Sequence, residues 1–490
     1  MNGERRAAVR VPLVLIAGLM LWGCGGAIAG RDAGPGHRET DAADSSTALI
    51  KWANEVVERQ YALRGEIPEL TRVFLHEDRE DVRRAAHVAL RMVGVANIEN
   101  PDGLVNEVIL PVLKAGREEK QILALTVLGE MGEGARLAVP FLLRMLREDN
   151  RMAAPTARAL GMIGWAPAVI PELMRLHTQS AVPPVRAEVG LALGKLKVAD
   201  AIPELTKDLS ADAPASRFYA ARALGMLGLL PENTVAKLIE TVRDSVPDVR
   251  AEAVRALGSS GNKSKEVLDA VAQSLVDQSR EVRIAAAQAA ADLCVGRNDI
   301  VRSMIRIASL CEADRYWERV QAKQALLQMG ETAIPALAEI LSDSQFGDQQ
   351  TAACVLAKVS ERGAKVLAEA AKSDDLCKAT SALMGMREGK VYADLFAPSV
   401  ASAILSKPLT YHGLMTTKIL RLRTEDIQRA TIAVLHDDRQ DISFRQDAAE
   451  VLGLMGCSSD MARRALEDAV RNSSPEVAAA ARKALANLPK

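Results

Sequence analysis

The chain has 490 residues, of which 49% are hydrophobic and 26% charged, a balance typical of folded soluble proteins, so wholesale disorder is excluded. Aromatic residues make up only 3%, so the apolar content is mainly Ala, Leu, Val, Ile and Met, which favours closely packed helices over sheets. The formal net charge of -1 gives the chain no bulk electrostatic attraction to nucleic acid.

Residues 1–23 have the pattern of a secretion signal. A positively charged beginning precedes an apolar stretch over residues 11–21, which is shorter than the ~20 apolar residues that span a membrane. The positive charges are Arg5, Arg6 and Arg10. We therefore expect this segment to direct export and to be removed.

The segment ends in Leu21-Trp22-Gly23-Cys24, which resembles the bacterial lipobox, although Trp22 replaces the usual small residue. The resemblance implies a lipoprotein signal peptide, cleavage before Cys24, a thioether-linked lipid on its sulfur and acylation of the new amino terminus, with palmitate as the expected chain. Several acyl chains anchor a protein firmly, because each buried CH₂ contributes about 0.8 kcal/mol. Gly25 follows the cysteine, which resembles outer-membrane sorting in Gram-negative lipoproteins. The alternative is an ordinary signal peptide with a chance cysteine.

The next segment predicts a flexible tether. Residues 24–47 are mostly Gly, Ala, Asp, Arg and Ser and show no apolar periodicity. Residues 48–63, which include Trp52 and Tyr61, are expected to form an N-terminal capping helix of the folded part. Without residues 1–23 the chain has 59 basic and 62 acidic residues, a net charge of -3.

One repeated unit fills the rest of the chain. Each unit contains a Leu, or once an Ala, at an equivalent position, which we call the anchor, and successive anchors are about 32 residues apart. The anchors are residues 90, 128, 160, 193, 224, 257, 290, 326, 356, 383, 420, 452 and 485. Those at 356 and 383 belong to degenerate units, and the unit at 420 is weak. The sequence therefore predicts about thirteen units.

The spacing within a unit predicts two helices. Val249, Ala253 and Leu257 recur at intervals of four residues, which puts them on one face of a second helix. A first helix is expected to begin at a recurring apolar-Pro pair, because Pro is tolerated in the first helical turn. A turn Asp such as Asp244 is expected to cap the second helix, and Gly after the anchor or three to four residues later is expected to end it. The apolar-Pro pairs are Ile170-Pro171, Ile202-Pro203 and Ile334-Pro335.

This two-helix pattern resembles the short bacterial HEAT repeat, of the type found in phycobilisome-lyase-like proteins, over about residues 62–488. The resemblance implies an all-α fold, a right-handed α-solenoid of about thirteen HEAT-like helix pairs, in which stacked neighbours share one core. We expect residues 48–490 to form this solenoid with a capping helix at each end. Solenoids serve many functions, so the fold alone does not assign one.

Few residues are arranged for catalysis. The histidines form no metal-binding motif, and His76-Glu77 and His436-Asp437 are expected to be solvated turn residues. No phosphate-binding loop is present, so we expect no cofactor, no metal and no small-molecule substrate. Five cysteines follow Cys24. A disulfide between Cys294 and Cys311 or between Cys354 and Cys377 is one interpretation. The preferred interpretation is that the cysteines are small buried side chains.

The most informative set of side chains is a row of arginines, which we call the arginine row. Each stands seven residues before an anchor, so stacking aligns them along the solenoid. One interpretation is structural, with each Arg paired to turn acids such as Asp244, Asp277 and Asp441; the other is a basic stripe that binds an acidic partner. Tyr316 and Trp317 begin a second helix beside the row; one interpretation is that they join such an interface, and the other is that they pack in the core. The row is Arg83, Arg186, Arg217, Arg250, Arg283, Arg319 and Arg445.

The sequence therefore predicts a lipid-anchored protein of the bacterial cell envelope, expected at the outer membrane and facing the periplasm. We expect it to be no enzyme but a protein-binding or scaffolding solenoid, which contacts the membrane through its lipid and binds no nucleic acid. An enzyme built on the solenoid, lyase-like or metal-dependent, is one alternative, and a convergent pocket of side chains with shifted pKa values would indicate it. A nucleic-acid-binding HEAT-like protein is another, against which the export signal and the net charge argue.

Overall fold

The second helix of each unit forms where small and branched apolar residues recur every three or four positions. In a computed structural model, which describes residues 67–93, 100–164, 167–310, 315–455 and 460–488, all thirteen anchors lie in helices. Twelve anchors are buried, and Leu485 in the last pair is partly buried. The weak and degenerate units at 356, 383 and 420 thus form the same helix as the others.

The helices alternate as first and second members of thirteen pairs. The first helices are α3 (Ile67–His76), α5 (Pro101–Leu104) with η3 (Val105–Ile109) and α6 (Leu110–Ala115), α8 (Val139–Glu148), α10 (Ile170–Gln179), α12 (Ile202–Asp208), α14 (Glu232–Thr241), α16 (Lys265–Ser274), α18 (Asn298–Ser309), α20 (Ile334–Asp343), α22 (Glu361–Ala370), α24 (Ala393–Leu405), α26 (Glu425–His436) and α28 (Asp460–Asn472). Short 3₁₀ turns lead into four of them: η4 (Gly132–Ala138), η5 (Ala199–Ala201), η7 (Gly330–Ala333) and η8 (Lys390–Tyr392).

The second helices carry the anchors. They are α4 (Glu80–Val93), α7 (Glu118–Met131), α9 (Ala153–Ile163), α11 (Pro183–Lys195), α13 (Pro214–Leu227), α15 (Pro247–Ser259), α17 (Arg280–Leu293), α19 (Tyr316–Met329), α21 (Phe346–Val359), α23 (Leu376–Met386), α25 (Thr410–Leu420), α27 (Ile442–Met455) and α29 (Pro475–Ala486).

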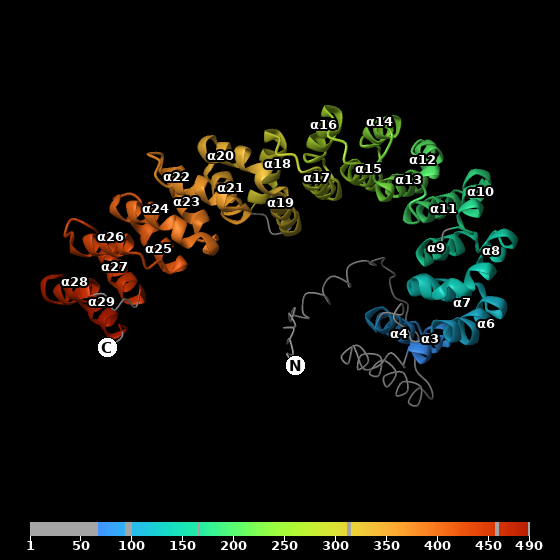
Figure 1. Ribbon diagram of the computed structural model, residues 1–490, viewed down its shortest axis with the longest axis horizontal. Helices are drawn as coiled ribbons and strands as arrows, with labels where there is room; N and C mark the ends of the chain where they lie inside the picture. Colours follow the sequence, from blue (N-terminus) through green and yellow to red (C-terminus); the bar gives the residue numbers. More distant parts are fainter. Residues whose placement is uncertain (1–66, 94–99, 165–166, 311–314, 456–459, 489–490) are drawn as a thin grey trace, which may run out of the picture.

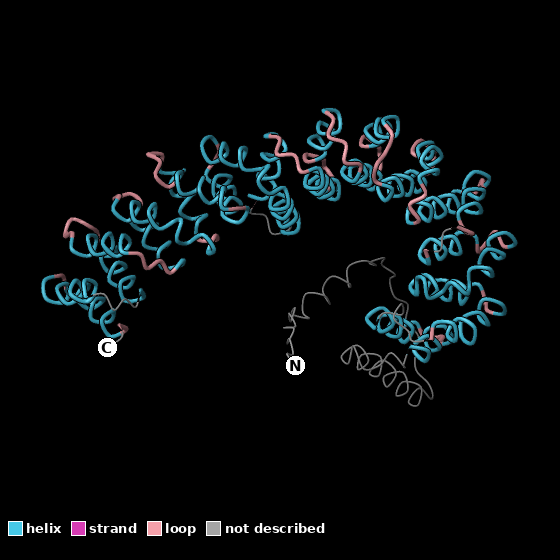
Figure 2. The backbone as a smooth tube through the Cα atoms, in the orientation of Figure 1, coloured by secondary structure: helices cyan, strands magenta, loops and turns pink. Residues whose placement is uncertain are grey.

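The pairs stack into a curved arc. From α8 onward the first helices line the outer side of the arc, whereas second helices such as α13, α15 and α17 line the inner side (Figure 1). Within the described ranges every regular element is helical, and short loops connect the helices (Figure 2). The prediction of an all-α solenoid is confirmed.

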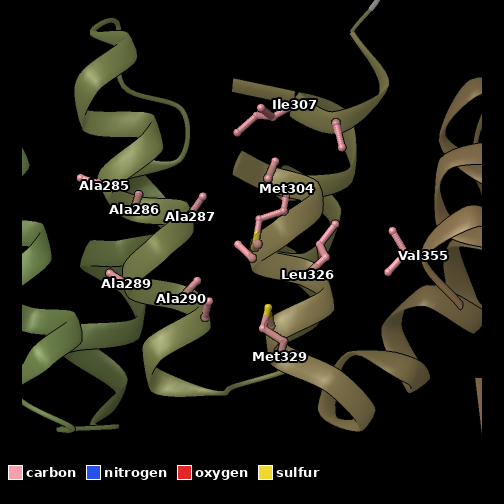
Figure 3. Close-up of a cluster of buried hydrophobic side chains, with 14 of the residues drawn as sticks. Ala285, Ala286, Ala287, Ala289, Ala290, Met304, Ile307, Leu326, Met329 and Val355 are labelled. Carbon is pink, nitrogen blue, oxygen red and sulfur yellow. The ribbon is translucent and has the colours of Figure 1, made fainter. Parts of the chain in front are cut away.

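The core between units is built from small residues beside larger ones. Ala286 and Ala290 of α17 belong to the same buried cluster as Met304 of α18 and Leu326 of α19, and Figure 3 shows these side chains between neighbouring helices. Small alanines let helix backbones approach, and the Met and Leu side chains fill the space that remains. This packing explains how a chain so poor in aromatic residues buries a continuous core.

The Gly that follows the anchor has a packing role that the sequence does not predict. Gly161, Gly194 and Gly258 lie inside α9, α11 and α15, and these helices continue past them. A Cβ atom on Gly258 would come within 2.7 Å of the Cα atom of Ala289 in the next second helix. Gly is therefore needed here for close approach of two helices, and each of the three helices also ends within two residues after it, close to where the sequence predicts.

Other local predictions have mixed outcomes. First helices α10, α12 and α20 begin at Ile170, Ile202 and Ile334, as the apolar-Pro pairs predict. Gly228 follows α13 with a positive φ of 87°, so a later Gly does end this helix. The predicted cap by Asp244 was wrong, because its carboxylate accepts the Val246 N–H within the turn, and α15 has no side-chain cap.

Several predictions concern residues outside the described ranges. These are the signal segment, Cys24, the tether and the capping helix with Trp52 and Tyr61. Among the described helices, none combines the length and the apolar character needed to cross a membrane.

Candidate functional site

The arginine row lies in the first turns of the second helices and connects successive units. Arg250 of α15 binds Asp277 of the following unit with two hydrogen bonds, from Nε to Oδ2 at 3.0 Å and from Nη2 to Oδ1 at 2.8 Å. Its Nη1 donates to the backbone carbonyl of Asp244, in the turn of its own unit, at 2.9 Å. One guanidinium therefore fixes two turns that belong to neighbouring repeats.

Two further arginines repeat this geometry. Arg217 binds Asp244 from Nε at 2.6 Å and from Nη2 at 3.0 Å, and its Nη1 donates to the carbonyl of Ala211. Arg283 binds Glu318 at 2.9 and 2.8 Å, and its Nη1 donates to the carbonyl of Asp277. The side chains of Arg217, Arg250 and Arg283 are only 14–15% exposed. These contacts agree with the structural interpretation of the row.

The other members of the row vary in their partners. Arg83 binds Glu119 of α7 at 3.0 Å, and Arg186 binds Asp208 at the end of α12. The turn acid Asp441 was expected to pair with the row, but Arg445 does not bind it. Arg445 binds Asp438 at 2.7 Å and donates to the Leu435 carbonyl. Asp441 instead accepts from the backbone and hydroxyl of Ser443.

The bridging carboxylates have pKa values below their ordinary range. Burial by itself would raise the pKa of Asp244, but hydrogen bonds from Arg217 and from the Val246 N–H outweigh it and lower this pKa. Burial would likewise raise the pKa of Asp277. Hydrogen bonds from Arg250 and the Ser279 N–H outweigh this effect and lower that pKa. Both carboxylates are thus held in the charged form that the arginines require.

The row is interrupted at α19. Asp343 stands thirteen residues before its anchor, as Asp244 and Asp277 do. By this position it would be the acid that binds Arg319 of the preceding unit. Asp343 instead binds Arg302 of α18 at 2.7 Å, while Arg319 donates to the Leu310 carbonyl at 3.0 Å. A surface hollow of about 600 Å³ opens here, between the end of α18 and the start of α21.

Tyr316 and Trp317 are exposed at the start of α19. Their side chains are 54% and 42% exposed, and the two rings meet edge to face with centroids 5.6 Å apart. The guanidinium of Arg319 lies over the Tyr316 ring at 5.8 Å. Buried packing, the other interpretation of these aromatics, therefore does not apply. They present apolar surface on the inner side of the arc.

A second set of ion pairs escaped the sequence analysis. Arg158 of α9 binds Glu188 of α11, with Nε 3.0 Å from Oε2, and Arg222 of α13 binds Glu252 of α15 at 2.7 Å. Each Arg stands two residues before an anchor, and each Glu stands five before the next. This regular offset is a signal in the sequence that could have predicted the pairs. They too connect neighbouring units.

Among the described residues, the histidines are not gathered into a metal-binding cluster. His177 is buried on α10, with Nε2 3.0 Å from Oδ2 of Asp208, although the two are not aligned as a hydrogen bond. His436 faces the Ala465 carbonyl at 3.2 Å. No cluster of three His, Cys, Asp or Glu side chains suited to a metal ion occurs in the part of the chain that the structure describes.

The cysteines differ from the preferred interpretation. Cys294 and Cys377 are exposed and Cys354 is partly exposed, and all three are free, so they are not small buried side chains and no Cys354–Cys377 bridge forms. Burial raises the pKa of the Cys354 thiol. Cys311 and Cys457 lie outside the described residues.

Comparison with known proteins agrees with the repeat. The family model for HEAT repeats matches residues 235–326, from α14 into α19. Helix pairs continue on both sides of this segment, so the matched HEAT repeats lie within a longer α-solenoid. No curated protein matches the chain. The short bacterial, phycobilisome-lyase-like type of repeat stays a prediction.

Several solved structures align with most of this chain at low sequence identity. In a Kap95:Nup1 complex the similar chain is 13% identical, with 86% of this chain and 66% of that one covered and a TM-score of 0.46. Yeast importin-beta (Kap95p) is 14% identical, with 90% and 68% covered and a TM-score of 0.43. An engineered protein is 18% identical, with 77% and 97% covered and a TM-score of 0.34. This chain spans about two thirds of the Kap95 chains, and likenesses this distant carry no argument about partners or activity.

Proposed function

We propose that this chain is a lipid-anchored protein of the bacterial cell envelope whose solenoid binds or scaffolds another protein and has no catalytic activity of its own. The observation that carries the proposal is the exposure of Tyr316 and Trp317 at the start of α19, a helix on the inner side of the arc. Exposed aromatic side chains are enriched in protein interfaces and contribute much of their binding energy.

The arginine row supports the proposal indirectly. Because Arg217, Arg250 and Arg283 join the units from α13 to α19, the shape of this part of the inner side is set before a partner arrives. Binding to a preformed surface costs less conformational entropy than binding that must order the surface first. These arginines therefore contribute to recognition by positioning inner helices, and the guanidinium groups of Arg217, Arg250 and Arg283 each bind a carboxylate and a backbone carbonyl within the solenoid.

The proposed location rests on the sequence of residues 1–25. A lipid on Cys24 would hold the chain at the membrane, and Gly25 favours the outer membrane, with the solenoid in the periplasm. Residues 24–47 would form a tether that lets the solenoid reach a partner away from the membrane surface.

Photocrosslinking in cells tests the binding function. A benzophenone amino acid in place of Trp317 places the reactive group on the inner side, and the same amino acid in place of Ala236, exposed on α14, places it on the outer side. We expect discrete protein adducts from position 317 and none of the same size from position 236. Absence of adducts at position 317, or identical adducts from both positions, would contradict the proposal.

A further inference from the structure

Five successive second helices begin with a large apolar side chain that is exposed. In α19, α21, α23, α25 and α27, one or both of the first two residues are aromatic or aliphatic, and these side chains are 42–54% exposed. Each stands at the first or second residue of its second helix, and helices α19 to α27 follow one another along the arc (Figure 1). We call them the apolar row: Tyr316, Trp317, Phe346, Leu376, Tyr411 and Ile442.

The repeat itself does not require these residues. Earlier second helices begin with acidic residues, with Pro or with mixed charges: α7 begins with Glu118-Glu119, α15 with Pro247-Asp248 and α17 with Arg280-Glu281. Those helices occupy the same place in the repeated unit as α19 to α27. Exposed apolar side chains repeated over five units in one half of the solenoid therefore need an explanation other than folding.

Uncharged polar groups lie beside the row on α19. Gln321 and Gln324 follow Trp317 on the same side of the helix, are partly or fully exposed, and make no hydrogen bond with other described residues. Amide side chains can donate to and accept from the backbone of an extended chain. Aromatic surface with few charges at its centre is the composition of protein interfaces.

The charge of these inner helices favours an acidic partner. Helices α19, α21, α23, α25 and α27 together carry six Lys or Arg and four Asp or Glu, and two of the four acids, Glu318 and Glu450, are held by Arg283 and Lys418. Lys323 of α19 makes no ion pair within the described residues, and Lys378 of α23 donates only to the Ser342 hydroxyl at 3.0 Å. Cations without carboxylate partners attract an acidic ligand.

Arg387 strengthens this charge. It follows α23 and is largely shielded from solvent by α25, where it donates to the Thr416 hydroxyl at 3.2 Å and faces Nδ1 of His412 at 3.4 Å. No carboxylate among the described residues pairs with it, and burial lowers its pKa. A shielded guanidinium without an anion gains more from an incoming carboxylate than an exposed one does.

The spacing of the helices determines which conformation of the partner fits. Packed helices lie about 8–10 Å apart. A polyproline II segment advances about 3.1 Å per residue and has three residues per turn, so every third side chain points the same way at intervals of about 9.3 Å. A segment in this conformation would place one side chain at each unit, whereas a β-strand, with its period of two, would not.

We propose that the apolar row binds an acidic, extended segment of a partner protein in a polyproline II-like conformation, with an apolar side chain at every third position. This inference rests on the proposed protein-binding function and adds the chemistry of the bound segment. The apolar side chains lie against the row, and the carboxylates between them meet Lys323, Lys378 and Arg387.

Peptide titration tests the inference. The probe is a fluorescein-labelled peptide of five Leu-Pro-Glu repeats, and fluorescence anisotropy is recorded with the full chain in detergent. We expect saturable binding that weakens at least tenfold for Trp317→Ala and for Lys378→Glu, with thermal melts of both variants recorded beside it, because Trp317 is exposed but Lys378 is only partly exposed. Leu229→Ala is the matched control, since Leu229 is exposed but lies outside the row. We expect it to bind normally.

Peptide controls separate charge from spacing. A peptide of five Leu-Pro-Lys repeats should bind at least tenfold more weakly, and so should a Leu-Pro-Glu peptide whose residues are rearranged to break the period of three. Equal binding of either control, or no binding of the first peptide, would overturn the inference.

Other occupants of the row would give different results. Binding of phosphatidylglycerol vesicles that Trp317→Ala abolishes, without peptide binding, would identify a membrane surface. A dimer in sedimentation that Trp317→Ala dissociates would identify a second copy of the chain. Either result contradicts the inference. If photocrosslinks from position 317 persist while the peptide fails to bind, the protein-binding function stands and only the nature of the segment is wrong.

Discussion

Arg250 and Asp277 join two consecutive repeats through a pair of parallel hydrogen bonds of 3.0 and 2.8 Å. The remaining Nη1 of Arg250 reaches back to the Asp244 carbonyl, and the Asp244 carboxylate is itself bound by Arg217 of the preceding unit. Each turn therefore accepts one Arg at its side chain and another at its backbone. A positive charge in the first turn of a helix is unfavourable to the helix dipole, and these contacts compensate for it.

Arg250→Ala should destabilise the solenoid by about 1–3 kcal/mol, because it leaves the Asp277 carboxylate half-buried without its cation. Denaturant unfolding of Arg250→Ala, Asp277→Asn and the double variant should reveal a favourable coupling between the two side chains. Arg255→Ala is the control: Arg255 is more exposed, and its partner Glu252 keeps Arg222. If the destabilisations of the two single variants simply add in the double variant, the Arg250–Asp277 ion pair contributes nothing to stability.

In Arg250→Ala, the yield of captured partner should fall only as much as the fraction of folded protein does. A basic stripe for an acidic partner would give the opposite result, with unchanged melts and weakened, salt-sensitive capture. Pull-down yield measured beside thermal melts on the same variant distinguishes the two interpretations.

Stability should decrease in acid because the pKa values of Asp244 and Asp277 are lowered in the folded chain. A carboxylate with a lowered folded pKa contributes stability above its unfolded pKa of about 3.9, and this contribution is lost as the pH falls through the folded value. Denaturant midpoints should therefore be steady near neutral pH and fall below about pH 5. Asp277→Asn should make this fall shallower, and an unchanged pH profile in that variant would contradict the assignment.

Gly258→Ala should destabilise the protein although Ala is the better helix former. The added Cβ atom would lie 2.7 Å from the Cα atom of Ala289, so two helices must separate, at a cost of about 1–3 kcal/mol. Gly347→Ala is the matched control, because Gly347 lies in the first turn of α21 with no atom within 4 Å of the added Cβ. Chemical denaturation should lower the midpoint of the first variant only. A more stable Gly258→Ala protein would mean that α15 and α17 are not packed as described.

The lipid anchor predicts a simple labelling result. Cys24→Ser should abolish incorporation of labelled palmitate and leave the precursor uncleaved by the lipoprotein peptidase. Labelling of the wild-type chain under the same conditions is the control, and unchanged labelling of the variant would remove the anchor from the account.

The sequence predicts the solenoid well because one pattern recurs in register. Buried residues such as Val249, Ala253 and Leu257 define the second helix in every unit, and even the weak unit at 420 folds as the others do. The role of Gly258 could not be predicted, since a helix-ending Gly and a close-contact Gly look alike until the neighbouring Ala289 is placed beside it.

The candidate site was predicted less completely. The spacing of the repeat predicted the positions of the arginine row. It did not predict which acid each Arg binds, because that depends on turn geometry: Arg445 binds Asp438 and not Asp441. Of the apolar row, the sequence predicted only Tyr316 and Trp317. Phe346, Leu376 and Ile442 can be recognised as equivalent positions only when the first residues of their helices are known.

Hydrogen exchange tests the central claim, that a protein partner binds the inner side of the arc, most directly. Exchange of the full chain is compared with and without the partner captured at position 317. We predict protection at the starts of α19, α21, α23, α25 and α27, with the outer helices α14, α16 and α18 unchanged. Protection confined to the outer helices, or no change anywhere when the complex is saturated, would contradict the account.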